Sequence, residues 1–397
     1  MNDHLEHLGS ALDKVSGYIY PNEVELHWGL LVVIYPYVTG LVAGAFILAS
    51  LEKVFRVKAV EPTYRLALLT ALAFLFVAPL PLQLHLGHPE RSFEIFLTPH
   101  FKSAMAMFGF VYVWYLMVVL LLEIWFEYRA DMIRWKQEAR GLKKLVYWIL
   151  ALGSTNLSPR AIEFDRKAVH VITLIGIPSA FLLHGYVGFI FGSVKANPWW
   201  SSVLMPIVFL FSAIVSGIAL VLLIYYVTSM IRRKAPDMAC LNQLASFLFY
   251  VLLIDFTLEL LDFIHRLYES EESIGILREL IYGRLFLSLT IVQILLGTIV
   301  PIVMLAVFRY SRLPDEMKRL GYFVAAALVQ VGIFSTRWNV VIGGQLFSKS
   351  LRGLTVYKLE IGGVEGLFTA MALLVLPFVI LYVLVKLLPP WGEPKAS

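Results

Sequence analysis

Cysteine is almost absent from this chain, and its scarcity excludes several kinds of redox centre. Cys240 is the only cysteine among 397 residues. One thiol cannot form an internal disulfide, hold a cysteine-ligated iron–sulfur cluster, build a cysteine-rich zinc site or attach haem through a C-x-x-C-H motif. If the chain handles electrons, it therefore does so through noncovalent haem or a diffusible organic carrier.

Charge is also scarce, and this predicts a membrane protein. Charged residues make up 15% of the chain and hydrophobic residues 59%, with a mean hydropathy of +0.77. A soluble domain carries about a quarter charged residues. The apolar runs are continuous and do not alternate every second residue, which favours helices over barrel strands. Residues 1–25 contain no apolar run, so we expect the first span to act as its own insertion signal.

Nine apolar segments have the length of a membrane span, about 20 residues. A tenth, at 145–152, is too short to cross and is expected to form an interfacial helix or a re-entrant piece. We therefore predict an all-α bundle of nine or ten spans, arranged as two four-helix-bundle-like halves of one membrane domain. The nine segments are 26–51, 66–84, 104–126, 168–191, 203–230, 241–264, 285–308, 322–342 and 364–386.

The connections between these spans carry unequal numbers of lysine and arginine. With nine spans, one side of the membrane receives 22 of them and the other side 10. Basic residues stay in the cytoplasm, so the formal net charge of +5 reports topology in the inner membrane rather than nucleic-acid binding. The predicted order is an outer segment 1–25, spans within 26–126, a basic cytoplasmic connection 127–167, spans within 168–386 and a cytoplasmic tail 387–397.

Three short outer connections are rich in polar or aromatic residues. The connection 85–103 contains three histidines, and an ordinary solvated hairpin is its simplest interpretation. After the fourth span, Trp199 and Trp200 are either interfacial aromatics or part of a specific surface. Arg337 stands shortly before a Gly-Gly-Gln run at 343–345, and it either snorkels to water or contributes to a docking surface for a partner.

The first span contains a glycine pair and a proline. Gly40 and Gly44 form a G-x-x-x-G pattern that lets a neighbouring helix approach closely. Pro36 is expected to kink the helix and to free backbone groups one turn earlier. Tyr35 lies beside the kink, and His27 lies about two turns outward. The helix therefore either shapes a slot for a planar head group with a carbonyl at each end, or it is a kinked helix with a purely structural role.

The sixth span carries three carboxyl groups on one helix face. Asp255, Glu259 and Asp262 occupy positions i, i+4 and i+7, and His265 follows on nearly the same face. Each carboxylate costs about 2.5–3.5 kcal/mol at mid-bilayer on insertion scales, so the stripe must be buried, hydrated or protonated. Such a column suits a proton relay. The alternative is a structural polar seam whose partners are Arg284, Arg337 or Gln293.

His170 and His184 lie fourteen residues apart on the fourth span, about four turns along one face. That spacing resembles the two-haem helix of cytochrome b subunits. Since no other span holds two deep histidines, we expect the pair to form hydrogen bonds rather than to ligate haem. We expect no metal site in this chain.

Together these motifs resemble those of the NrfD/PsrC family of integral membrane subunits. The first span reads YPYVTGLVAGA at 35–45, and the outer connection reads HLGHPER at 85–91, where the family has an LG-x-P-x-R pattern. HGYVG at 184–188 and RWNVVIGGQ at 337–345 are similar to the longer branch of the family, which includes DsrP, HybB and QrcD.

The resemblance implies a haem-free bundle that binds menaquinone noncovalently near the outer face and has no iron–sulfur cluster of its own. It also implies a ferredoxin-like iron–sulfur subunit docked there, with further catalytic subunits in the complex. The family's polar quinone contact in the first span is often histidine, and Tyr35 stands at the matching place. We therefore expect quinone contacts at the outer ends of spans one to four, from His27, Tyr35, His85, Arg91 and His184.

The favoured function is that of a menaquinone-interacting subunit of a respiratory oxidoreductase complex. Among such complexes, one of sulfur metabolism is favoured. Quinol oxidation would release two electrons to the partner and protons through a relay of Asp255, Glu259, Asp262 and His265. The chain would not be an enzyme alone. Alternatives are a hydrogenase or molybdoenzyme complex, or a proton-translocating or anchoring subunit without a quinone site. A transporter should show an internal repeat with broken helices, and the sequence has no convincing one.

Overall fold

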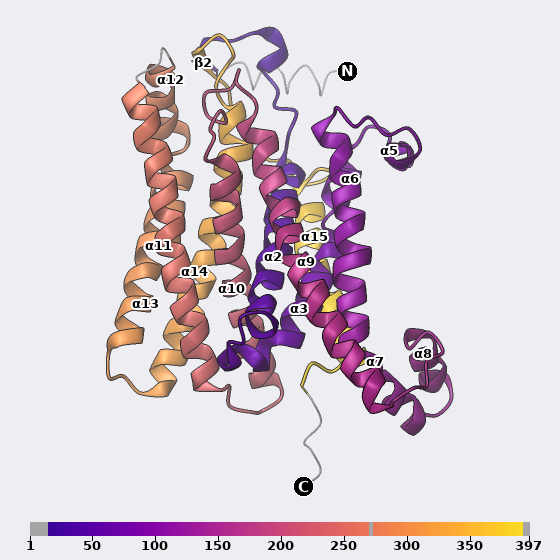
Figure 1. The fold of residues 1–397 in the computed structure, drawn as a ribbon. Helices are drawn as coiled ribbons and strands as arrows, with labels where there is room; N and C mark the ends of the chain where they lie inside the picture. Colours follow the sequence, from indigo (N-terminus) through magenta and orange to yellow (C-terminus); the bar gives the residue numbers. More distant parts are fainter. Residues whose placement is uncertain (1–14, 270–272, 392–397) are drawn as a thin grey trace.

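The computed structural model describes residues 15–269 and 273–391, which form a bundle of long helices (Figure 1). Nine helices within these ranges are long and apolar enough to cross a membrane, which confirms the predicted all-α fold with nine spans. In chain order the spans consist of α2 (Leu30–Lys53), α3 with α4 (Glu61–Val77, Leu80–His85), α6 with the π-helix η4 and α7 (Ala104–Trp114, Tyr115–Leu121, Leu122–Glu138), α9 (Pro159–Gly192), α10 (Met205–Ile231), α11 (Met238–Glu269), the π-helix η6 with α13 (Phe286–Ile299, Val300–Tyr310), α14 (Asp315–Val341) and α15 (Leu367–Leu387).

The two ends of the bundle differ in their short elements. At the end we call the sheet end, β1 (Ser16–Tyr18) pairs antiparallel with β2 (Arg352–Leu354). The opposite end carries α8 (Leu142–Leu150) and is called the α8 end (Figure 1). The described parts of the connections predicted to be outer all lie at the sheet end. The remaining short helices are η1 (Pro21–Glu23), η2 (Lys58–Val60), η3 (Pro89–Arg91), α5 (Glu94–Leu97), α12 (Ile274–Glu279), η5 (Leu280–Arg284) and η7 (Gly343–Gln345).

The long connection predicted at 127–167 is largely helical. Both α7 and α9 extend several residues into it, and the short α8 lies between them at the bundle end. Arg129 of α7 holds the two extensions together, because its Nη2 lies 2.6 Å from Asp165 Oδ2 on α9. The patch at 145–152 therefore contributes to α8, a helix of nine residues that is too short to cross the membrane.

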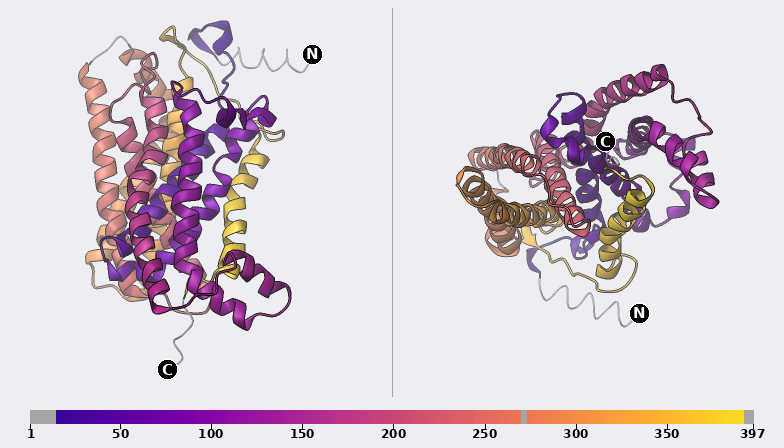
Figure 2. Two further views of the ribbon diagram at one scale, coloured as in Figure 1. Left: turned by 45° about the vertical axis from the view of Figure 1, so that its right-hand side comes forward. Right: turned by 90° about the horizontal axis from the view of Figure 1, so that it is seen from below.

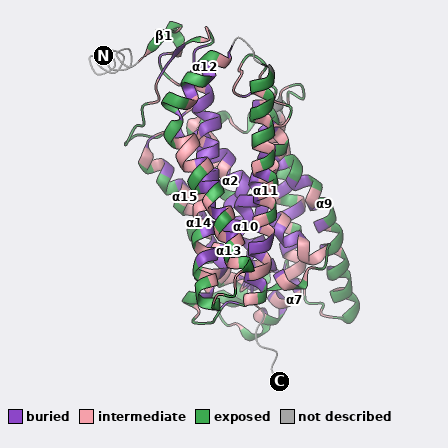
Figure 3. Ribbon diagram, turned by 90° about the vertical axis from the view of Figure 1, so that its left-hand side faces the viewer, coloured by how far each residue is buried: buried purple, intermediate pink, exposed green. Residues whose placement is uncertain are grey.

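Tight packing of α2 against α10 forms the centre of the bundle. Both helices are largely buried, whereas α11 and α13 expose much of their surface (Figure 3). A Cβ atom on Gly44 would lie 2.0 Å from the Ala213 carbonyl oxygen, and one on Gly217 would lie 2.2 Å from the Gly44 carbonyl carbon. Since only glycine fits on both sides of this crossing, the G-x-x-x-G pattern marks a real helix contact.

The remaining helices lie on two sides of this central pair (Figure 2). On one side α10 packs with α11 and α14, and α13 packs with both of these. On the other side α2 packs with α3 and α9, and α7 and η4 cover α9. We call these groups the C-terminal half and the N-terminal half. Contacts of α2 with both α10 and α14 join the halves.

The connection after α9 is tied to the sheet end of α14 by two tryptophans. Trp199 Nε1 donates to the Asn339 carbonyl at 2.8 Å, and Trp200 Nε1 donates to the Val340 carbonyl at 2.6 Å. A Cβ atom on Gly344 would lie 2.0 Å from Trp200 Nε1. The two indoles and this glycine therefore make contacts inside the protein. The tryptophans are not simply interfacial anchors, which was one of the two interpretations of the sequence.

Candidate functional site

The most deeply buried polar centre joins α9 and α14 across the two halves. His184 and Arg337 are both 0% exposed, and Arg337 Nη2 lies 3.2 Å from His184 Nε2 and 2.5 Å from Ser212 Oγ. Because a guanidinium group can only donate, His184 Nε2 accepts, and its Nδ1 proton points to Thr39 Oγ1 at 3.3 Å. Arg337 is therefore held inside the bundle and does not snorkel to water.

This centre also faces the acidic stripe on α11. Asp255 is 2% exposed, and both Asp255 and Glu259 interact electrostatically with Arg337. Among the described residues, none hydrogen-bonds Asp255 Oδ1 or the Nε and Nη1 atoms of Arg337. Buried polar atoms of this kind are commonly satisfied by ordered water. The Asp255 end of the stripe is therefore turned into the bundle, where it interacts electrostatically with the buried arginine, whereas Glu259 and Asp262 are partly exposed.

Glu259 takes part in a hydrogen-bond chain through η6 and α14. Gln293 Nε2 donates to the two Glu259 carboxylate oxygens at 3.3 and 3.2 Å. Asn339 Nδ2 donates to Gln293 Oε1 at 2.7 Å, and Ser288 Oγ donates to Asn339 Oδ1 at 2.6 Å. Gln293, one of the partners expected from the sequence, is thus hydrogen-bonded to Glu259, and Arg337, another, interacts with it electrostatically.

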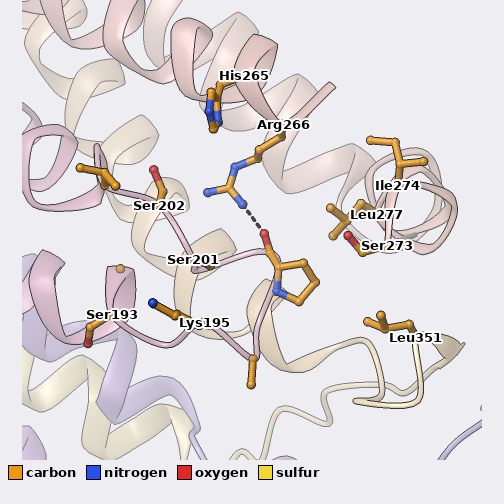
Figure 4. Close-up of a pocket in the computed structure, with 14 residues that line it drawn as sticks. Ser193, Lys195, Ser201, Ser202, His265, Arg266, Ser273, Ile274, Leu277 and Leu351 are labelled. Atoms are coloured by element: carbon orange, nitrogen blue, oxygen red, sulfur yellow. Dashed lines mark hydrogen bonds between the residues drawn. The ribbon is translucent and has the colours of Figure 1, made fainter. Parts of the chain in front are cut away.

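Asp262 and Arg266 form the sheet-end part of the stripe. Asp262 Oδ2 lies 3.0 Å from Arg266 Nη2, and Asp262 Oδ1 accepts a hydrogen bond from Ser202. Arg266 also donates to the carbonyl of Pro198 in the connection after α9 (Figure 4). This ion pair therefore fixes the connection to α11.

Two cavities adjoin this ion pair. A cavity of about 710 Å³ lies between the connection after α9, α11 and α12, with Lys195 and His265 in its lining (Figure 4). A more apolar cavity of about 340 Å³ lies between α11, η6 and α14. Arg266 lines both cavities, so it stands at the boundary between the cavity at the sheet end and the cavity between the spanning helices.

His85 lies at the sheet end, beside the first turn of α2. Its Nδ1 lies 3.1 Å from Glu365 Oε1. The Tyr357 hydroxyl accepts a hydrogen bond from the Leu30 amide at 3.0 Å, and burial raises the pKa of this phenol. A Cβ atom on Gly29 would lie 3.3 Å from that hydroxyl and 3.6 Å from Glu365 Oε2. A histidine, a carboxylate and a phenol therefore gather around the start of α2.

Two members of this sheet-end cluster were missed from the sequence. Glu365 is 280 residues from His85, and Tyr357 lies in the connection before α15, which has no helical or strand periodicity. The only sequence signal is that this connection is predicted to lie on the same side of the membrane as His85. That signal predicts that Tyr357 lies at the same end of the bundle as His85, but it does not predict which side chains are in contact there.

The five residues expected to contact quinone do not form a single cluster. His27 and Arg91 are exposed, and Arg91 Nε lies 3.2 Å from Glu94 Oε1. Tyr35 is buried with its ring 5.2 Å from that of Phe108. His184 belongs to the Arg337 centre, whereas His85 and His27 lie near the start of α2.

The histidines of the fourth span have separate partners. His170 is exposed, and its Nδ1 lies 3.2 Å from the Lys53 carbonyl oxygen, whereas His184 is buried against Arg337. Over the described part of the chain, no three His, Cys, Asp or Glu side chains are grouped as metal ligands would be.

The long apolar spans and their buried polar centres define a polytopic helical membrane protein. The chain matches the family described as "Polysulphide reductase, NrfD" over residues 21–349, so it belongs to this family and is a multi-pass integral membrane protein.

Three relatives illustrate the range of the family. The chain is 33% identical to a subunit of the selenate reductase of Mesobacillus selenatarsenatis, over 79% of this chain and 73% of that protein. It is 27% identical to NrfD of Escherichia coli, over 50% of this chain and 59% of the relative. It is 24% identical to the Hdr-like menaquinol oxidoreductase integral membrane subunit of Archaeoglobus fulgidus, over 55% of this chain and 46% of the relative.

Proposed function

We propose that this chain is the menaquinone-interacting membrane subunit of a respiratory oxidoreductase complex, and that the quinone head binds at the sheet end beside His85. The observation that carries the proposal is the His85–Glu365 pair against the first turn of α2, in a chain of the NrfD family. An imidazole held by a carboxylate can accept a proton from a hydroquinone hydroxyl and release it to water at the same end.

The neighbours of His85 suit this role. Leu84 and Leu86 flank it and are 39% and 46% exposed, so they offer apolar surface to a ring. Tyr357 lies against the same turn of α2 and adds a hydroxyl that can hydrogen-bond a carbonyl. Of the other expected contacts, His27 is close enough along the chain to take part, Tyr35 would act from beneath the site, and His184 would support the site only by holding the helices together.

The proposed partner is an iron–sulfur subunit at the sheet end, which takes or supplies the two electrons of the quinone reaction. The names of the selenate reductase and menaquinol oxidoreductase relatives support a place in a multi-subunit complex. The longer branch of the family and a complex of sulfur metabolism remain the preferred assignment on the motifs at 184–188 and 337–345. A hydrogenase or molybdoenzyme complex is the alternative.

The α11 stripe is proposed to move protons. Asp255 and Glu259 interact electrostatically with Arg337, whereas Asp262 and His265 line the two cavities that meet at Arg266. Helical neighbours of this spacing are roughly 5–6 Å apart, close enough to exchange protons through intervening water. Proton movement along the stripe would make quinone chemistry electrogenic.

Binding of a fluorescent menaquinol analogue to the purified complex tests the quinone site. His85→Ala should weaken binding about tenfold or more, because it removes the group that meets a quinone oxygen. His88→Ala is the matched control, since His88 is exposed and hydrogen-bonds only Glu90 among the described residues. Unchanged binding in both His85→Ala and Tyr35→Phe would place the quinone elsewhere.

Reconstituted complexes test the proton relay. Glu259→Gln keeps the side-chain shape but removes the exchangeable proton, so quinone-linked turnover should fall about 10²-fold or lose its coupling to membrane potential. Glu163→Gln, an exposed change on α9 at the α8 end, should have no effect. Wild-type turnover and potential in both Glu259→Gln and Asp262→Asn would make the stripe structural.

The orientation has its own test. The sheet end is proposed to face outward and the α8 end the cytoplasm, because most lysine and arginine lie in connections at the α8 end. Reporter fusions should place the N-terminus outside and the C-terminus inside. Both reporters on one side of the membrane would contradict nine spans.

A further inference from the structure

The apolar cavity of about 340 Å³ in the C-terminal half has no part in the proposed quinone site at His85. Its volume lies within the range of about 300–1,000 Å³ that is typical of small-molecule sites. Most of its wall is aromatic or aliphatic, and includes Phe256, Leu260, Phe263, Phe286, Leu289 and Ile294.

The cavity opens sideways toward lipid. Leu260, Phe263 and Phe286 line it and are 44%, 38% and 44% exposed, on helices that span the membrane. An exposed apolar side chain on a spanning helix faces hydrocarbon. A ligand dissolved in the bilayer can therefore enter between α11 and η6 without passing through water.

Polar groups lie at both ends of the cavity. Glu259, Gln293 and Asn339 form the hydrogen-bonded chain at the inner end, and Asp262 with Arg266 lies at the sheet end. Glu259 and Arg266 are seven residues apart on α11, about 10 Å along the helix axis. The cavity thus suits an apolar molecule that carries an oxygen at each end.

We propose that this cavity is a second binding site for the head group of an isoprenoid quinone, reached laterally from the membrane. Gln293 and Asn339 can donate to a quinone oxygen, and the Glu259 carboxylate can accept from a hydroquinone hydroxyl. A lipid acyl chain offers no oxygen to these amides, each of which has a second N–H proton beyond the one that it donates within the hydrogen-bonded chain. The inference rests on the proposed quinone chemistry but not on the site at His85.

Photolabelling of the purified complex with an azido-naphthoquinone that carries an isoprenoid tail tests the proposal. Peptides from α11 and η6 should be labelled, separately from peptides near His85. Leu260→Trp narrows the mouth of the cavity and should reduce the α11 and η6 labelling at least tenfold. Leu261→Trp is the matched control, because Leu261 is 51% exposed and does not line the cavity; labelling should stay at the wild-type level.

Labelling near His85 reports on folding and on the first site independently. If it persists in Leu260→Trp while the α11 and η6 labelling is lost, the second site is supported. Labelling near His85 alone in the wild type overturns the second site and leaves the proposed function intact. Labelling of α11 and η6 alone keeps the inference and removes the His85 site. Competition distinguishes quinone from lipid in this cavity. If excess phospholipid displaces the label and excess menaquinone does not, the cavity binds lipid and the proposal is overturned.

Discussion

Two polar regions inside the membrane-spanning bundle differ in what surrounds them. One is the His184–Arg337 centre, and the other is the part of α11 from Glu259 to Arg266, whose polar side chains line cavities. Arg337 and His184 have no exposed surface and lie among close-packed helices of both halves. Glu259, Asp262 and Arg266 line cavities at the edge of the C-terminal half.

This difference separates structural from chemical roles. A sealed polar pair exchanges no ligand or bulk water, so its main contribution is to fix how α9, α10 and α14 fit together. A carboxylate that borders a cavity can meet a ligand and pass a proton onward. Changes at the sealed centre should therefore act on stability, and changes along the cavity should act on quinone chemistry.

The largest effect is expected from removing the buried arginine. Arg337→Leu leaves Asp255 and Glu259 without their cationic neighbour and should destabilise the folded subunit by about 3–5 kcal/mol, since it breaks a buried charge group. Thermal unfolding in detergent and the amount of subunit in membranes measure this. Arg134→Leu, at a surface pair 57% exposed on the arginine side, should cost about 0–1 kcal/mol. Equal stability of the two variants would contradict a structural role for Arg337.

The seal around the centre can be opened by a smaller change. Gly44→Ala forces α2 away from α10, because the added Cβ would overlap the Ala213 carbonyl, and should cost about 1–3 kcal/mol. Gly87→Ala, where nothing lies within 4 Å of the added atom, should stay within about 0.5 kcal/mol of wild type. If both alanine variants unfold together with wild type, α2 and α10 do not pack closely at this crossing.

A double-mutant cycle sharpens the comparison further. His184→Leu combined with Arg337→Leu should show a coupling energy of about 0.5–3 kcal/mol, because the two side chains share a hydrogen bond. His184→Leu combined with Asp262→Asn should be additive within about 0.5 kcal/mol if the cavity edge is independent of the centre. The free energies of unfolding of the single and double variants give both coupling energies. Strong coupling between His184 and Asp262 would show that the centre and the cavity edge are not independent.

The smallest effect on stability is expected at Trp199. This residue lies in the connection after α9, and its side chain lines the apolar cavity. Trp199→Phe keeps the aromatic ring but loses the hydrogen bond to the Asn339 carbonyl, and should cost about 0.5–1.5 kcal/mol. The melting temperature of the complex reports this change. Trp148→Phe, at a tryptophan 51% exposed on α8, serves as the control and should leave it unchanged.

Much of the fold could be predicted because the bilayer imposes it. Hydrocarbon thickness requires about 20 apolar residues for each helix, so nine such segments predict nine spans. The ends of α7 and α9 could not be predicted in this way, because they leave the apolar region and depend on the Arg129–Asp165 pair. Helical periodicity likewise placed Asp255, Glu259 and Asp262 on one face, and the cost of charge in lipid turned that face inward.

The sequence by itself therefore determined the number of spans, the inward direction of the acidic stripe and the close approach at Gly44. Only the tertiary structure decided which polar groups meet. Glu365 reaches His85 across 280 residues, and Arg337 meets His184 on another helix, although its sequence position near a span end also allowed contact with water. The physical reason is that hydropathy and periodicity act along one helix, whereas a hydrogen bond between helices depends on the packing angle and register of both.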